Sequence, residues 1–262
     1  MGLMAIIAHE THHTVRGFDC GYGGPFRALS LANYFQEAAG NHAFALGVGM
    51  GAMKAAGRTW MLSKLDIGID QLPQAGQEVL VRTWPAGTSK LFALRYLELK
   101  ALDGSLLAGA LYEYLVVDIE ARRPLRPEKI LDPGLKGDYP PPRADLNPGL
   151  QGDQGFSPEA LQAFEPTLSL AASPRHLDYN GHVNNGHIID WLVDAVPPKG
   201  RGCGELARLK VDFIAELRSG DQVLASIRQA DASLPEWRIL LSREGEPVAK
   251  AYAAWRPASW RP

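Results

Sequence analysis

An acid, an amide and an imidazole alternate with other residues in one short stretch of this chain. Asp178, Asn180 and His182 lie in the sequence LDYNGHVNNGH, which occupies residues 177–187 and runs into the apolar segment IIDWLVDAV. A side-chain amide can hold a carbonyl oxygen or a water molecule, and His and Asp can orient that group or move protons. We therefore expect polar chemistry here, beside a hydrophobic helix.

The polar stretch is predicted to lie at the N-terminus of that helix. Asp178, Asn180 and Gly181 form loops and turns, and the apolar period begins after Asn184. A helix N-terminus presents unpaired N–H groups and partial positive charge, which favour a carbonyl oxygen that becomes an oxyanion. Each of these residues alone is more often a cap or turn former, and Asn184 and Asn185 are expected to serve the helix start.

Other chemical classes leave weaker signals. His182 and His187 are five residues apart, which on a helix turns them about 140° from each other, and no Glu or Cys completes a zinc motif. We therefore expect no metal and no cofactor. Cys20 and Cys203 lack CxxC spacing, which fits a reducing cytosol. The G-x-G-x-x-A match at 47–52 ends an expected helix, so dinucleotide binding is discarded.

Composition favours a soluble globular protein. The chain has 262 residues, of which 46% are hydrophobic and 21% are charged, enough for one large or two small domains. The net charge of -2 gives no general case for binding nucleic acid or a membrane surface. The opening MGLMAIIAHE has no basic region and no long apolar run, so we expect a cytoplasmic protein without membrane insertion.

The chain contains an internal repeat. KLDIGIDQLPQAGQEVLV aligns without a gap on RLKVDFIAELRSGDQVLA at a shift of 144 residues, and LDGSLLAGALYEY aligns on REGEPVAKAYAAW at a shift of 141. A helical apolar period precedes the strand-like segments in each half, with Leu31 and Phe35 in the first and Ile189 and Leu192 in the second. One helix with an antiparallel meander in each half predicts an α+β fold of two packed units.

Three regions follow from the repeat. We expect an N-terminal unit over residues 8–125, a linker over 126–165 and a C-terminal unit over 166–262. The linker is rich in Pro and Gly and has no periodicity, so it should be exposed. Pro197 and Pro198 should end the second helix.

A helix wrapped by an antiparallel sheet and duplicated in tandem resembles the double hotdog architecture. The motifs resemble those of the acyl-acyl-carrier-protein thioesterases of bacteria and plant plastids, over nearly the whole chain. In the first half they are NYFQEAAGNHAFALGVG, RTWMLSKLDIGIDQLPQAGQEVLVRTWP and VVDIEARRPLRP; in the second they are Asp178-x-Asn180-x-His182-Val183-Asn184-Asn185 and Asp212-Phe213-x-x-Glu216.

The resemblance implies hydrolysis of the thioester of acyl-acyl carrier protein to free fatty acid. It implies that Asn180 holds the substrate carbonyl or water, with His182 and Asp178 in support. Glu216 follows a break in strand alternation, where a solvated strand end would equally carry Glu. The resemblance implies that Glu216 is the general base on water. Plant relatives carry Cys after this Glu, and Leu217 stands there in this chain, which removes a Cys-His-Asn mechanism.

The first half is expected to supply an acyl pocket and no second site. Its corresponding region, FDCGYGGPFRALS, has no Asn-x-His pair. Adaptable apolar residues that could line an acyl tunnel, or equally form ordinary core, are Met50, Met53, Trp60 and Met61. Of the histidines outside the motif, His42 is the one most expected to face the pocket.

The partner implied by the resemblance is acyl carrier protein, which presents the acyl group on phosphopantetheine. Two other functions stay open, because one scaffold hosts several chemistries. One is a hotdog acyl-CoA thioesterase or hydratase, and the other is a non-catalytic acyl-binding protein. A tandem chain already holds two hotdog units, so monomer and homodimer both fit the sequence.

Overall fold

The computed structural model describes residues 8–21, 24–135, 139–146, 148, 155–202, 204–231 and 234–256. The chain divides into two compact units, which we call unit 1 (residues 1–26 and 30–148) and unit 2 (27–29 and 149–262). Cys203 lies outside the described residues. None of the described helices combines the length and the hydropathy that crossing a membrane requires.

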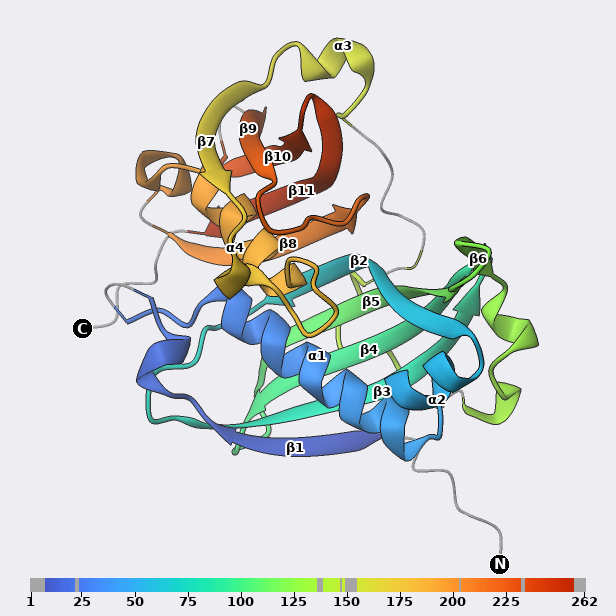
Figure 1. Ribbon diagram of the computed structural model, residues 1–262. Coiled ribbons are helices and arrows are strands. Elements are labelled where there is room, and N and C mark those ends of the chain that lie inside the picture. Colours follow the sequence, from blue (N-terminus) through green and yellow to red (C-terminus); the bar gives the residue numbers. More distant parts are fainter. Residues whose placement is uncertain are drawn as a thin grey trace, which may run out of the picture. The chain divides into compact units, whose positions relative to one another are not determined.

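Unit 1 is an antiparallel sheet with one long helix across it (Figure 1). The strand order is β1-β3-β4-β5-β2, and the short β6 pairs with β5. Leu31, Phe35 and Ala38 of α1 are buried at helical spacing, and the Phe35 ring meets Tyr112 of the sheet edge-on. The elements are β1 (His9–Thr14), α1 (Ala28–Ala45), α2 (Met50–Ala55), β2 (Arg58–Ile69), β3 (Glu78–Ser89), β4 (Phe92–Ala101), β5 (Leu106–Asp118) and β6 (Arg123–Leu125).

Unit 2 repeats this plan with a shorter helix. Its strand order is β7-β9-β10-β11-β8, and α4 covers 11 residues against the 18 of α1. Helix α4 ends at Ala195, with Pro197 and Pro198 directly after its cap, as predicted. The elements are α3 (Pro158–Leu161), β7 (Glu165–Ala171), α4 (Asn185–Ala195), β8 (Glu205–Phe213), β9 (Gln222–Asp231), β10 (Glu236–Arg243) and β11 (Glu246–Arg256).

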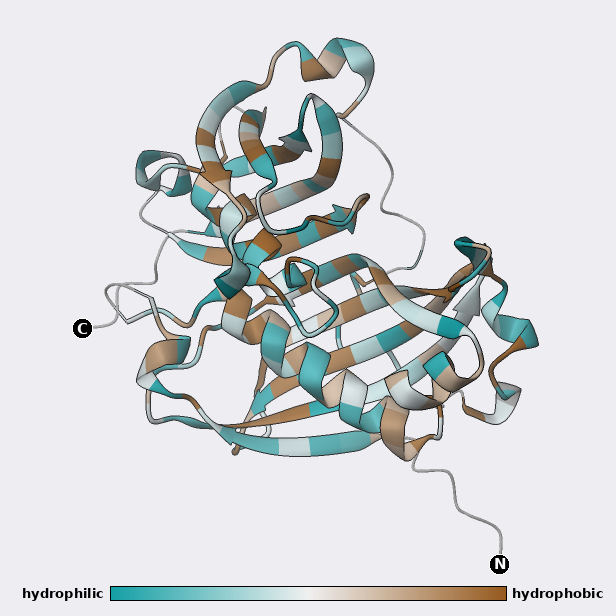
Figure 2. Ribbon diagram, viewed as in Figure 1, coloured by the Kyte–Doolittle hydropathy of each residue, from teal (hydrophilic) through white to brown (hydrophobic). Residues whose placement is uncertain are grey.

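The sequence repeat is visible in the strand registers. In unit 1, β2 pairs with β5 so that Ile67 lies opposite Ala110. In unit 2, β8 pairs with β11 so that Val211 lies opposite Ala251. The two shifts of 144 and 141 carry the first pair onto the second, so both halves use one hydrogen-bonding pattern. Hydrophobic and hydrophilic bands alternate along the strands in Figure 2, as two-faced strands require.

Part of the expected linker packs on unit 1. Leu146 is 1% exposed and lies in a cluster with Leu94 and Leu111, so the expected exposure of this segment is wrong at that residue. An apolar side chain gains free energy by covering apolar sheet surface, and this outweighs a locally irregular sequence. The boundaries 126 and 165 stay predictions.

Arg143 lies along the same segment, above a pair of glycines. Gly68 of β2 and Gly109 of β5 are register partners, and a Cβ built on Gly68 would come within 2.4 Å of Arg143 Nε. The guanidinium forms ion pairs with Asp70 and Asp145. The missing side chains of the two glycines therefore make the groove that Arg143 occupies.

Candidate active site

The predicted polar stretch forms a tight turn before α4. Leu177 and Val183 form an isolated antiparallel bridge, and the N–H of Asp178 donates to the His182 carbonyl at 2.8 Å. Gly181 has φ of 81°, a left-handed conformation that glycine adopts without a steric penalty. The turn therefore brings the alternating residues of the motif close together.

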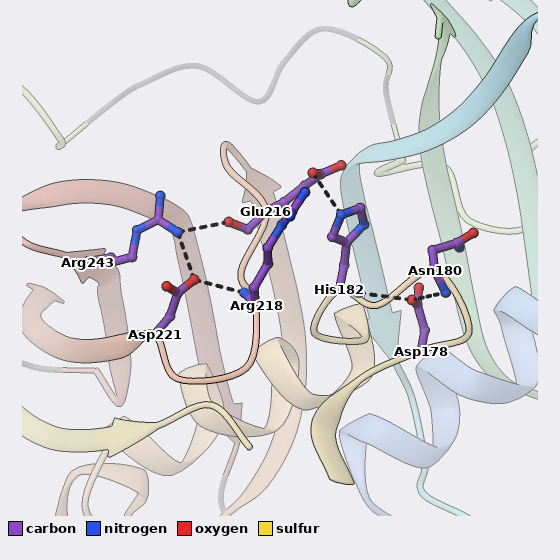
Figure 3. Close-up of polar contacts among 7 residues, drawn as sticks. All are labelled: Asp178, Asn180, His182, Glu216, Arg218, Asp221 and Arg243. Atoms are coloured by element: carbon purple, nitrogen blue, oxygen red, sulfur yellow. Dashed lines mark hydrogen bonds and ion pairs between the residues drawn. The ribbon is translucent and has the colours of Figure 1, made fainter. Parts of the chain in front are cut away.

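Asp178 holds the backbone of this turn. Its Oδ1 accepts hydrogen bonds from the N–H of Asn180 at 2.8 Å and of His182 at 3.3 Å (Figure 3). This is an Asx-type arrangement, in which a side-chain carboxylate replaces a backbone acceptor. The expected support by Asp178 is thus a contact with the peptide backbone, whereas the imidazole of His182 has another partner.

That partner is Glu216. His182 Nε2 lies 3.2 Å from Glu216 Oε2, within hydrogen-bonding distance. The side chains are 29% and 49% exposed, so water reaches both. In the view of Figure 3, the side chain of Asn180 lies on the other side of the His182 ring from Glu216. The structure therefore brings the side chains of His182 and Glu216 into direct contact, while Asp178 binds the backbone of the turn and Asn180 is exposed.

Glu216 belongs to the loop that follows β8, as its place after the broken alternation predicted. The Glu216 carbonyl accepts from Arg243 Nη1 at 3.3 Å, and the same nitrogen donates to Asp221 Oδ2 at 2.8 Å. The N–H of Arg218 donates to Asp221, which lowers the pKa of that carboxyl. Leu217, the departure from the plant pattern, is buried.

Two of these positioning residues, Asp221 and Arg243, were missed from the sequence. Their ion pair ties the loop of Glu216 to β10, but nothing in their spacing distinguishes them from ordinary surface charges. The loop is also tied to the polar turn, because the N–H of Val183 donates to the Leu217 carbonyl at 2.8 Å. The geometry of the site therefore depends on contacts of residues outside the predicted catalytic set.

Most backbone N–H groups of the turn have acceptors within the motif or beside it. The donors and their acceptors are Asn180 and His182 to Asp178 Oδ1, Gly181 to Asp178 O, Val183 to Leu217 O, Asn184 to His176 O, and Gly186 to Asn184 Oδ1. These bonds stabilise the loop. The expected help of backbone N–H groups at the helix start stays a prediction.

Asn184 caps the helix, as predicted. Its side chain accepts from the Gly186 N–H at 2.7 Å, and α4 begins at Asn185. His187 lies within the helix and packs its ring against that of His176, 5.0 Å away. Desolvation lowers the pKa of His187, and the nearby His176 lowers it further.

The described residues at the two ends of the corresponding segment in unit 1 repeat the hydrogen bonds of this turn. Cys20 and Phe26 form an isolated bridge over as many residues as Leu177 and Val183, and Gly21 N donates to Pro25 O at 2.7 Å. In sequence alignment, the places of Asp178, Asn180, His182 and Glu216 are taken by Gly21, Gly23, Pro25 and Leu72. The hydrogen bonds at the two ends of the turn are therefore repeated, and the side chains predicted to be catalytic are not.

The four predicted pocket residues do not share one face. Trp60 meets Tyr114 edge-on, on the face of the sheet that carries α1, and its neighbour Met61 must point to the opposite face of β2. Met53 of α2 is buried, whereas Met50 is partly exposed. His42 is fully buried between α1 and the sheet. The acyl-pocket assignment of these residues stays a prediction.

Comparison with known families gives two matches. Residues 7–132 match the model of the acyl-ACP thioesterase N-terminal domain, and residues 167–257 match that of the acyl-ACP thioesterase C-terminal domain. A palmitoyl-acyl carrier protein thioesterase, chloroplastic, of Cuphea hookeriana is 25% identical over 96% of this chain. A dodecanoyl-[acyl-carrier-protein] hydrolase, chloroplastic, of Cinnamomum camphora is 24% identical over 93% of it. The chain spans 63% and 66% of the length of these relatives.

Solved structures show the same fold. An acyl-ACP thioesterase from Bacteroides thetaiotaomicron has a TM-score of 0.81 at 22% identity and covers 95% of this chain and 98% of its own. The 12:0-ACP thioesterase from Umbellularia californica has a TM-score of 0.80 at 19% identity and covers 98% and 100%. The predicted α+β tandem hotdog class is confirmed.

Proposed function

The chain belongs to the acyl-ACP thioesterase family, and from this premise we propose that it hydrolyses acyl-acyl carrier protein to free fatty acid. The observation that carries the proposal is the contact of His182 with Glu216, beside a turn that Asp178 orders. The relatives are named as acyl-carrier-protein hydrolases, which supports this substrate class.

In the proposed reaction, Glu216 takes a proton from a water molecule. The water oxygen forms a bond to the thioester carbonyl carbon, and the amide of Asn180 stabilises the oxyanion that results. The carbon–sulfur bond then breaks, and the proton passes to the thiolate of the carrier arm. Atoms balance as one water and one thioester giving one acid and one thiol.

His182 positions and polarises Glu216 in this scheme. An Nε2–H donated to the carboxylate fixes one oxygen, and the other remains for the water. The exposure of both side chains supports water as the nucleophile, and the residue after Glu216 is Leu217, which has no thiol.

We propose a cytoplasmic location, which cell fractionation tests.

The test compares the wild-type protein with Glu216→Gln on acyl-acyl carrier protein and on the matching acyl-CoA. Wild type should release fatty acid, faster from the carrier protein, and Glu216→Gln should lower turnover by about 10² to 10⁴ because the base is lost. Glu246→Gln, at an exposed position at the start of β11, is the matched control.

Three outcomes would contradict the proposal in different ways. Wild-type turnover by Glu216→Gln removes the base assignment. A preference for acyl-CoA removes the carrier-protein substrate. Undetectable hydrolysis by wild type, together with co-purified lipid, would show an acyl-binding protein.

A further inference from the structure

Arg95 places a positive charge inside unit 1. On β4, Arg95 shares a face with the buried Ala93 and Leu97, while Leu94 and Tyr96 lie on the opposite face. Its register partner on β5 is Tyr112, whose ring meets Phe35 of α1. Arg95 therefore points to the space between the sheet and the helix.

The known partners of Arg95 are neutral. Its Nη1 donates to His42 Nδ1 at 2.9 Å and to Thr83 Oγ1 at 3.2 Å, and both of these residues are fully buried. In the described part of the chain, no carboxylate forms an ion pair with Arg95. Burial lowers the pKa of Arg95 to about 10, so the guanidinium is still charged at neutral pH.

The remaining donors of this guanidinium are available. Across the residues that the structure describes, Nη2 and Nε of Arg95 have no hydrogen-bond partner. Protein surrounds most of the residue, but part of its surface stays accessible to solvent. The hydroxyl of Tyr112, on the neighbouring strand, is buried and likewise lacks a partner among those residues. A partly enclosed cation whose remaining donors are reachable from solvent can bind an acceptor there.

Aromatic side chains lead away from this charge. Tyr114 follows Tyr112 on the same face, with ring centroids 6.2 Å apart, and Trp60 meets Tyr114 edge-on at 6.1 Å. These rings offer apolar surface to an aliphatic chain. The same face of the sheet thus carries a cationic end and an apolar side.

The fold itself does not require the charge. In unit 2, Trp237 pairs with Ala253 of β11, and the repeat shift makes this the counterpart of Arg95 with Tyr112. An apolar ring with its N–H bonded to the Gly200 carbonyl therefore occupies the equivalent place. An Arg at this place points to a ligand.

We propose that unit 1 contains a binding site for a carboxylate at the end of an aliphatic chain, anchored by Arg95. A guanidinium matches a carboxylate with two parallel hydrogen bonds, and enclosure by protein strengthens them. Under the proposed function, this carboxylate has two sources. It is either a carboxylate at the far end of the acyl chain of the substrate, or the carboxylate of the released fatty acid. The site deepens that function, and its binding can be measured without turnover.

The first experiment measures binding by calorimetry in the Glu216→Gln protein. Decanoate should bind about tenfold more tightly than its uncharged methyl ester. Arg95→Met should abolish this preference, Arg95→Lys should keep part of it, and Arg123→Met, which removes an exposed charge of β6, should leave it intact. Equal affinity for acid and ester in the protein that retains Arg95 would overturn the proposal, and this result does not depend on how Arg95→Met folds. A preference for the acid that persists in a folded Arg95→Met protein would also overturn it.

The second experiment identifies the source with catalytically active protein. Faster hydrolysis of an ω-carboxydecanoyl than of a decanoyl thioester, lost in Arg95→Met, assigns the distal end of the substrate. Inhibition by decanoate that Arg95→Met relieves assigns the product. Carboxylate binding that changes neither rate nor inhibition shows adventitious binding and overturns the site. Because the first experiment uses no turnover, failure of hydrolysis and failure of this site are distinguishable.

Discussion

The side chains of Asp178 and Asn180 have different environments within one turn. The carboxylate of Asp178 binds two backbone N–H groups, whereas the side chain of Asn180 is exposed beside His182. In the proposed mechanism, the amide of Asn180 is a side-chain donor to the oxyanion. Removal of this amide should therefore affect the transition state more than the fold.

Asn180→Ala should lose about 3 kcal/mol of transition-state stabilisation, because one oxyanion donor disappears. The measurement is kcat/KM on acyl-acyl carrier protein, with the urea midpoint as a check on folding. Asn185→Ala, at the helix start, is the control and should retain turnover. An unchanged kcat/KM in Asn180→Ala would remove the amide from the mechanism.

His187 should make stability depend on pH. Its pKa is lower in the folded protein than the ordinary 6.5, chiefly through desolvation. Between pH 6.5 and the lower pKa of the folded protein, the unfolded chain binds a proton at this residue and the folded protein does not. The free energy of unfolding therefore decreases as the pH is lowered through this range. Urea midpoints at pH 7.5 and 5.5 should differ less in His187→Gln than in wild type. Parallel curves for both proteins would contradict this.

Residue types revealed the reactive cluster better than its surroundings. The D-x-N-x-H spacing and the position of Glu216 were sufficient to place these side chains in unit 2. The inward charge of Arg95 was not predicted, because one Arg within FALRYLEL looks like a solvent-facing residue until the register is known.

At the scale of elements, the repeat predicted more than the local periods did. Two sequence shifts reproduce the pairing of β2 with β5 and of β8 with β11. The packing of Leu146 and Arg143 against the sheet was not predictable, because a Pro- and Gly-rich sequence has no hydrophobic periodicity that indicates a packing partner.

The glycine groove under Arg143 can be tested by a double-mutant cycle. Gly68→Ala should lower the free energy of unfolding by roughly 1 kcal/mol, since its Cβ displaces the guanidinium from Asp70 and Asp145. In an Arg143→Ala background the same change should be neutral or stabilising, because the groove is empty. Additive effects of the two substitutions in urea unfolding would show that Gly68 and Arg143 do not interact.

At the scale of the molecule, the two units share one plan and differ in side chains. Cys20 is a free thiol in unit 1, and Cys203 lies outside the described residues. Water attack through Glu216 uses neither. A thiol therefore has no role in the proposed cleavage.

Alkylation of the intact protein with iodoacetamide should leave hydrolysis unchanged. Mass spectrometry reports which thiol is modified, and Cys20→Ser is the control for steric effects of the added group. Loss of activity in step with labelling of Cys20 or Cys203 would contradict the mechanism.

Unit 1 repeats the hydrogen bonds at the ends of the turn and carries Gly21 and Pro25 where unit 2 carries Asp178 and His182. A duplicated ancestor with two equal copies would have to conserve reactive groups in both. If unit 2 alone carries the catalytic side chains, as we propose, the interior of unit 1 can change without altering them. We therefore expect laboratory evolution confined to unit 1 to change which acyl chains the protein binds and to leave the proposed hydrolysis step unchanged.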